Sequence, residues 1–127
     1  MKNFVFSTNR YDEEAKKHGK AKALDMFRVK TSSEGYKHPR EMEYTKFPGN
    51  YIKIKHENFR SVLTTKQFTI EGQQICVYIA LRMFARGDSE YDKFKLSTKS
   101  EKERDTITGK VSLDWAYYEK KVKELLK

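Results

Sequence analysis

The chain has little of what secreted and membrane proteins usually contain. Its 127 residues include one cysteine, Cys76, so no disulfide can form within the chain. The N-terminus lacks the apolar stretch of a signal peptide, and no window of the sequence approaches the length of a membrane span. These absences predict a cytoplasmic protein in a reducing compartment, without a membrane partner.

Side chains that commonly bind metals or nucleotides are few and unfavourably spaced. His18, His38 and His56 lie far apart in the sequence, and Cys76 lies inside an apolar run. A metal site needs ligands at short, regular spacing, which this set does not provide. Residues 88–90 lack the glycine pattern of a phosphate-binding loop. We therefore expect neither a metal nor a cofactor.

Positive charge, in contrast, is abundant. The chain has 27 lysines and arginines against 18 acidic residues, which gives a formal charge of +9. Hydrophobic residues make up 37% of the sequence, enough for the core of a single domain but not of two. The excess charge favours a nucleic acid, an acidic protein or an anionic surface as partner. Charge scattered over an ordinary basic protein is the alternative.

Three segments in the middle of the chain alternate in the manner of β-strands: residues 51–55, 58–65 and 75–86. Alternation places Lys53 and Lys55 on one face of a sheet and the intervening isoleucines on the other. In the third segment one face would carry Ile75, Val77, Ile79, Leu81 and Met83, and the other Cys76, Tyr78, Ala80, Arg82, Phe84 and Arg86. Short joints at residues 56–57 and 71–73 indicate hairpins.

The segments that precede these strands predict an α+β fold. Residues 3–8 read as a strand, and residues 10–29 as a helical stripe that Gly19 interrupts, with Asn9 as the cap. Residues 31–50 have turn chemistry around a short extended piece at 41–46. We expect a small antiparallel sheet of about four strands, with the N-terminal helix or helices on the face opposite Lys53 and Lys55.

After Tyr91 the composition changes, which predicts two units, residues 1–95 and 96–127. Residues 96–110 are polar and read as a linker or an exposed helix. Residues 112–127 read as an amphipathic helix capped by Ser112. Its apolar side chains would cover the sheet, a second copy of the chain or a downstream domain. The helix ends without a stop signal, which favours a partner on this helix or a longer parent chain.

The order of these elements and residues resembles the RelE/ParE toxin superfamily, in particular its RelE-like ribosome-dependent mRNA interferase branch. The similarity covers residues 49–55, 58–63 and 75–94 best, and ends in the spacing Arg-x-x-x-x-Tyr. The resemblance implies a compact antiparallel sheet with one or two helices packed on one side. It also implies cleavage of mRNA in the ribosomal A site without a metal, and neutralisation by a cognate antitoxin.

The resemblance implies five catalytic residues, which are Lys53, Lys55, Arg60, Arg86 and Tyr91. Arg82, the competitor of Arg86, and His56 are assigned to RNA binding. Metal-free cleavage uses the 2′-hydroxyl as nucleophile and needs a base, an acid and cations that hold the developing charge. A lysine serves as base only if neighbouring cations depress its pKa. Tyr91 would transfer a proton or stack on a base.

Each assignment has a structural alternative. The lysines could lie on the exposed side of an edge strand, Arg60 could pair with Glu57 or Glu43, and Tyr91 could pack against the sheet.

Two other functions fit the same resemblance: an inactive module that binds nucleic acid or protein, for example within a larger helicase or ATPase, and a ParE-like topoisomerase inhibitor. The joint presence of the five residues favours the ribonuclease.

Overall fold

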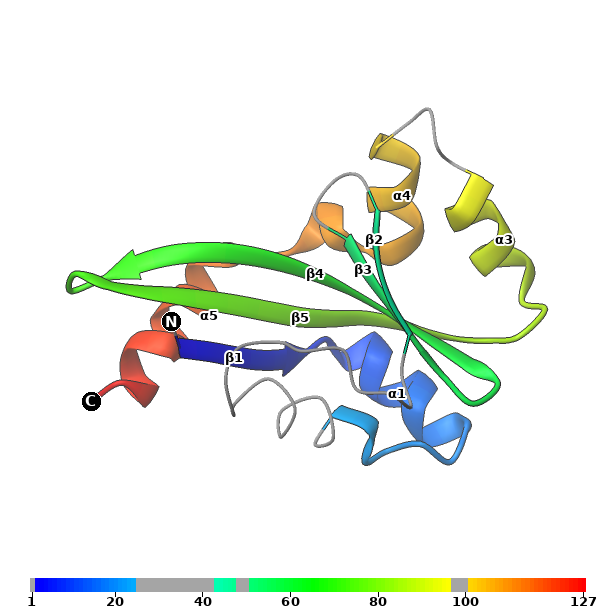
Figure 1. Ribbon diagram of the computed structural model, residues 1–127, viewed down its shortest axis with the longest axis horizontal. Coiled ribbons are helices and arrows are strands. Elements are labelled where there is room, and N and C mark those ends of the chain that lie inside the picture. The colour runs from blue at the N-terminus through cyan, green and yellow to red at the C-terminus, as the bar shows by residue number, and fades with distance from the viewer. Residues whose placement is uncertain (1, 25–42, 48–50, 97–100) are drawn as a thin grey trace.

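The structure is a computed structural model that describes residues 2–24, 43–47, 51–96 and 101–127. Within these residues a single five-stranded sheet carries helices on both faces (Figure 1). The strands are β1 (Lys2–Ser7), β2 (Glu43–Phe47), β3 (Tyr51–His56), β4 (Phe59–Ile70) and β5 (Gln73–Ala85). The helices are α1 (Asn9–Lys17), α3 (Ser89–Leu96), α4 (Glu101–Thr108) and α5 (Trp115–Leu125), with a 3₁₀ turn, η1 (Lys110–Ser112), before the last.

The strand order is β1-β5-β4-β3-β2, and the predicted α+β class is confirmed. Strands β2 to β5 form the expected run of four antiparallel strands, while β1 adds to β5 in parallel as a fifth. The long β4–β5 hairpin turns at Glu71 and Gly72, whose φ angles of 52° and 76° are both positive. Two successive left-handed residues are what a tight two-residue hairpin requires, and glycine adopts that conformation without strain.

Helix α1 packs on the face of the sheet opposite Lys53 and Lys55, as predicted. Tyr11 and Ala15 of the helix share a buried cluster with Ile52 and Ile54 of β3. The Tyr11 hydroxyl also lies 3.0 Å from the Ser61 hydroxyl of β4. The helix ends at Lys17, before the left-handed Gly19, and helical backbone resumes at residues 23–24, so Gly19 interrupts the segment as predicted. Residues 25–29 of the predicted helical segment lie outside the described residues.

The N-terminal cap of α1 is Thr8, not Asn9. The Thr8 hydroxyl accepts a hydrogen bond from the Tyr11 amide at 3.2 Å. The backbone amide of Thr8 donates a hydrogen bond to the Ala80 carbonyl of β5 at 3.1 Å. One residue therefore ends the pairing of β1 with β5 and begins the helix, which fixes where α1 starts on the sheet.

The other face is covered by α3, α4 and α5. The expectation that residues 96–110 form a linker or helix exposed to solvent was wrong for the exposure of α4, and residues 97–100 lie outside the described residues. Arg104 and Thr108 of this helix are each only 2% exposed, and the Arg104 guanidinium donates to the Phe94 carbonyl of α3 at 3.1 Å. A helix that packs through polar side chains carries no apolar stripe, so its sequence looks like a solvated segment. The boundary between residues 95 and 96 stays a prediction.

Helix α5 packs on the sheet, which was the first of the three surfaces that its apolar side chains were predicted to cover. The Tyr118 ring lies 5.6 Å from Phe6 of β1, and the Trp115 ring lies 6.2 Å from Phe68 of β4. The helix begins three residues later than predicted, and its cap is Asp114. The Asp114 carboxylate accepts from the amides of Ala116 and Tyr117, while Ser112 belongs to the preceding 3₁₀ turn.

We therefore expect Asp114→Ala to lower the free energy of unfolding by about 1 kcal/mol, the usual effect of losing a helix cap. Ser112→Ala is the matched control and should change it by less than about 0.5 kcal/mol, because Ser112 does not cap the helix. Urea denaturation of both variants measures the difference. An equal loss in the two variants would contradict the assignment of the cap.

A bulge in β5 overturns part of the predicted alternation. Val62 pairs with Arg82 but the next residue, Leu63, pairs with Ala80, so Leu81 is an extra residue in its strand. The faces exchange at this point. Met83 joins the core under α1, while Phe84 joins the opposite core together with Ile79. Bulges commonly redirect a side chain, and here the redirected side chain is Arg82.

Arg82 is buried, with 4% exposed, and binds three helices at once. Its guanidinium donates to both Glu14 oxygens of α1 at 2.8 and 2.9 Å, to Glu90 of α3 at 2.7 Å, and to the Ile107 carbonyl of α4 at 2.9 Å. Glu14 in turn accepts a hydrogen bond from the Met83 amide at 3.2 Å. Met83 lies beyond Ala80, the last residue of β5 that pairs with β1. Arg82 therefore joins α1, α3 and α4 to the sheet.

Arg82→Ala should lower the free energy of unfolding by about 3–5 kcal/mol, because it leaves the part-buried Glu14 carboxylate without its counter-charge. Arg86→Ala, at the exposed end of the same strand, is the control and should cost less than about 0.5 kcal/mol. Chemical denaturation at pH 7 gives both values. Similar small losses would show that Arg82 does not hold the helices together.

Candidate nucleic-acid interface

Three of the predicted catalytic cations share one face of the sheet. Lys55 lies opposite Arg60, and Lys53 lies opposite Val62, in the antiparallel pairing of β3 with β4. Cross-strand partners project to the same side, so Lys53, Lys55 and Arg60 form one cluster, which we call the basic face. All three side chains are half-buried, because α3 and α4 cover the same side of the sheet nearby.

Tyr91 lies beside this cluster on α3. Its ring centroid is 5.5 Å from that of Phe84, the partner of Arg60 on β5, and only 5% of the residue is exposed. Burial raises the pKa of the Tyr91 hydroxyl, and the charge and hydrogen bond of Arg60 partly oppose that rise. A phenol in this state remains protonated at neutral pH and can donate a proton or a hydrogen bond. Its ring has little free surface on which a base could stack.

Arg86 and His56 lie at the same end of the sheet. Arg86 follows β5 directly, is exposed, and donates its amide to the Asn58 carbonyl of the β3–β4 turn at 2.7 Å. That turn joins the strands of Lys55 and Arg60, so Arg86 borders the basic face. His56 is the last residue of β3, and its side chain lies outside the described residues, so its role in RNA binding stays a prediction.

Arg82 does not belong to this interface. The family resemblance assigned it to RNA binding, as the competitor of Arg86. Its guanidinium is instead buried and bound to Glu14, to Glu90 and to the Ile107 carbonyl, so it does not lie on the exposed surface that a phosphate would reach. The period-two pattern could not reveal this, since the bulge at Leu81 decides which side of the sheet Arg82 faces.

The structure adds two lysines that the sequence did not suggest. Lys95 lies with its ammonium 4.9 Å from the centre of the Tyr91 ring, one helical turn away on α3. Lys110 lies 4.8 Å from the Tyr51 ring, which shares the face of Lys53 and whose hydroxyl meets Asp105 and Thr108 of α4. The i, i+4 spacing of Tyr91 and Lys95 was a readable signal, but only once residues 89–96 were known to be helical.

Comparison of the chain with protein-family models, with curated proteins and with solved structures found no match. Among the described residues, no group of three or more histidine, cysteine or acidic side chains could hold a metal ion. Within the same residues no helix is both long and apolar enough to cross a membrane.

The contact that fixes α3 beside the basic face should weaken in acid. The hydrogen bond from Arg82 lowers the pKa of Glu90 below its ordinary value of 4.5, and the charges of Arg82 and Arg10 act in the same direction. A depressed pKa in the folded state means that ionised Glu90 stabilises the fold above pH 4.5. This stabilisation is lost as the pH falls through the folded-state pKa.

We expect Glu90→Gln to melt at a lower temperature than the wild type at pH 7, and the gap to close as the pH is lowered below 4.5. Melting temperatures over a pH series test this. Glu71→Gln, at the exposed hairpin turn, is the control and should follow the wild type throughout. A gap for Glu90→Gln that persists at pH 2 would contradict the linkage.

Proposed function

We propose that this chain is a RelE-like toxin, a cytoplasmic endoribonuclease that cleaves mRNA on the ribosome without a metal. The observation that carries the proposal is the juxtaposition of Lys55, Arg60 and Tyr91, from three different elements, on one face of the sheet. The placement of α1 on the opposite face agrees with the arrangement that the resemblance implies. An overall charge of +9 favours a polyanionic substrate.

The proposed reaction begins with attack of a ribose 2′-hydroxyl on the neighbouring phosphorus. The bond from phosphorus to the 5′-oxygen breaks, leaving a 2′,3′-cyclic phosphate and a 5′-hydroxyl. Arg60 and Arg86 would stabilise the negative charge that develops on the phosphate oxygens. Lys53 or Lys55, next to other cations, would accept the proton from the 2′-hydroxyl.

Tyr91 would act as a donor to the leaving oxygen in this scheme. Its raised pKa keeps the proton on the phenol, and the Arg60 guanidinium beside it would favour the phenolate formed after transfer. Tyr91 has little exposed surface, so in this role it can be reached only from the side of Arg60. Arg60 is the neighbour with which the Tyr91 hydroxyl shares a hydrogen bond.

The same burial favours a second candidate function, a module of this fold that binds RNA without cutting it. A cognate antitoxin, and a protein partner or downstream domain on the C-terminal helix, also belong to the proposal. On that helix Leu125 is 62% exposed, which offers apolar area to a partner.

The proposal predicts that the purified chain cleaves mRNA in ribosome complexes in the presence of EDTA. Lys53→Ala/Lys55→Ala should reduce the rate at least about 100-fold, since each lost cation removes stabilisation of the transition state. Lys16→Ala/Lys17→Ala is the matched control, with the same loss of charge on exposed positions of α1 across the sheet, and should cleave like the wild type. Primer extension on an mRNA of known sequence measures the positions and the extent of cleavage.

RNA affinity measured over a salt series separates the two candidate functions. Binding to single-stranded RNA should weaken with salt, and the Lys53→Ala/Lys55→Ala variant should show a slope smaller by about 1.4, the value for two phosphate contacts. Salt-dependent binding without cleavage would favour the binding module. Absence of both, with the control variant folded and ribosomes present, would refute the assignment to RNA.

A further inference from the structure

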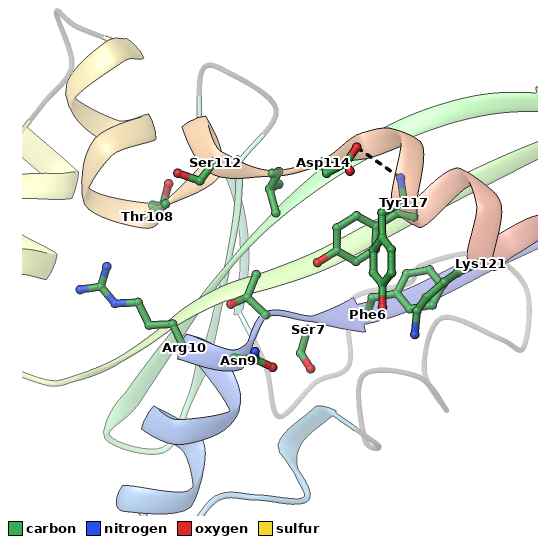
Figure 2. A pocket seen from close by; sticks show the side chains of 13 residues that line it. Phe6, Ser7, Asn9, Arg10, Thr108, Ser112, Asp114, Tyr117 and Lys121 are labelled. Atoms are coloured by element: carbon green, nitrogen blue, oxygen red, sulfur yellow. Dashed lines mark hydrogen bonds between the residues drawn. The ribbon is translucent and has the colours of Figure 1, made fainter.

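A cavity lined by both polar and apolar side chains lies apart from the basic face. It has a volume of about 680 Å³ and is formed where β1 and α1 meet η1 and α5. Figure 2 shows Arg10 at one end of this cavity and Phe6, Tyr117 and Lys121 at the other. None of its lining residues belongs to the basic face, whose members come from β3 and β4. The volume falls within the range of about 300–1,000 Å³ that is usual for small-molecule sites.

Tyr118 is the residue that marks this cavity as a binding site. It lines the cavity and is 9% exposed, yet its hydroxyl forms no hydrogen bond with any other residue that the structure describes. Buried hydroxyls almost always have a partner, and leaving one without costs stability. Two other polar groups that line or border the cavity are already bound. Ser7 donates to Asp12 at 2.6 Å, and the Asp114 carboxylate caps α5.

The two ends of the cavity differ in chemistry. At one end lies the start of α1, a helix of nine residues. Thr8 accepts from the amides of Tyr11 and Asp12, and the amides of Asn9 and Arg10 have no acceptor within the helix. Arg10 adds a positive charge there, and its contact with Glu90 is a long 3.6 Å between side chains that are each about half exposed. Such a pair is weak and yields readily to a stronger anion. The positive end therefore suits a phosphate.

The other end is aromatic. Tyr117 is half exposed and stands edge-on to Tyr118, with ring centroids 5.2 Å apart. The Lys121 ammonium lies 5.1 Å from the centre of the Tyr117 ring. Asp114 lies near Tyr117 as well (Figure 2), so this end of the cavity carries charges of both signs. An exposed aromatic ring between a donor and an acceptor suits a planar, polar base that stacks and forms hydrogen bonds.

From these features we infer that the cavity binds a nucleotide. The phosphate would lie against Arg10 and the first amides of α1, the base would stack on Tyr117, and the Tyr118 hydroxyl would gain its missing partner. The nucleotide can be free or a unit of a single-stranded RNA, and both present the same phosphate and base. This site stands independently of the proposed ribonuclease.

Trp115, the only tryptophan of the chain, lies 6.4 Å from the Tyr118 ring and reports on the site. AMP should change its fluorescence with saturation, and inorganic phosphate or adenosine alone should bind at least about tenfold more weakly. Tyr118→Phe and Arg10→Ala should each weaken AMP binding about tenfold. Lys17→Ala, exposed on the same helix, is the control and should bind as the wild type does.

The melting temperature gives a second readout for Tyr118→Phe. Removing a hydroxyl that has no partner should leave the melting temperature of the ligand-free protein unchanged or raise it, so weaker AMP binding cannot be ascribed to unfolding. The Lys53→Ala/Lys55→Ala variant should bind AMP normally, which separates this site from the ribonuclease proposal. A hexanucleotide of RNA tested in parallel distinguishes the two sources of the nucleotide.

Tighter binding of the hexanucleotide than of AMP identifies RNA as the ligand, and binding of AMP alone identifies a free nucleotide; either supports the site. Three results would overturn it: a wild-type protein that binds neither ligand, variants that bind AMP as tightly as the wild type does, or phosphate that binds as tightly as AMP.

Discussion

The ion pairs of Arg82 are the contact on which the arrangement of this protein depends. A buried guanidinium costs several kcal/mol of desolvation unless all of its donors are satisfied, and Arg82 obtains its acceptors from α1, α3 and α4 together. None of these helices supplies enough on its own. The sheet can therefore hold Arg82 inside only if the three helices lie where they do. Phe84, whose ring lies 4.4 Å below the guanidinium, completes the environment.

Both candidate sites follow from this constraint. Glu90 and Tyr91 are consecutive on α3, so the bond from Arg82 to Glu90 also fixes Tyr91 against Phe84 and near Arg60. On the other side of Arg82, Glu14 holds α1 against the edge of β5, and the first turn of that helix supplies Arg10 to the cavity between α1 and α5. One buried arginine thus sets the geometry of two separate surfaces, although it contacts neither proposed ligand.

The two surfaces differ in how they treat charge. On the basic face, Lys53, Lys55 and Arg60 lie on one side of two neighbouring strands, and such a concentration of positive charge favours an anionic ligand. In the cavity the charges are mixed, and the Tyr118 hydroxyl has no hydrogen-bond partner among the described residues. The first surface suits an extended polyanion bound largely through phosphates. The second suits a single nucleotide with a defined orientation.

Much of the sheet could be predicted from the sequence, because period-two alternation is a local pattern and the apolar isoleucines of β3 are expected in the core. The position of α1 followed from the same pattern, and so did the shared face of Lys53, Lys55 and Arg60. The start of α5 was misplaced by three residues, since Ser112 and Asp114 are both good caps and only the packing of Trp115 and Tyr118 selects between them.

What the sequence alone determined is thus the α+β class, the antiparallel run of strands and the side on which the lysines lie, all consequences of local periodicity. Only the tertiary structure determined that Arg82 is buried in ion pairs, that Arg104 is buried and that Tyr91 lies close to Arg60. A single extra residue in β5 reversed the alternation, and no local pattern marks where a bulge will form. Polar side chains become buried only when distant partners meet them, and those partners lie up to 68 residues away, as Glu14 does from Arg82.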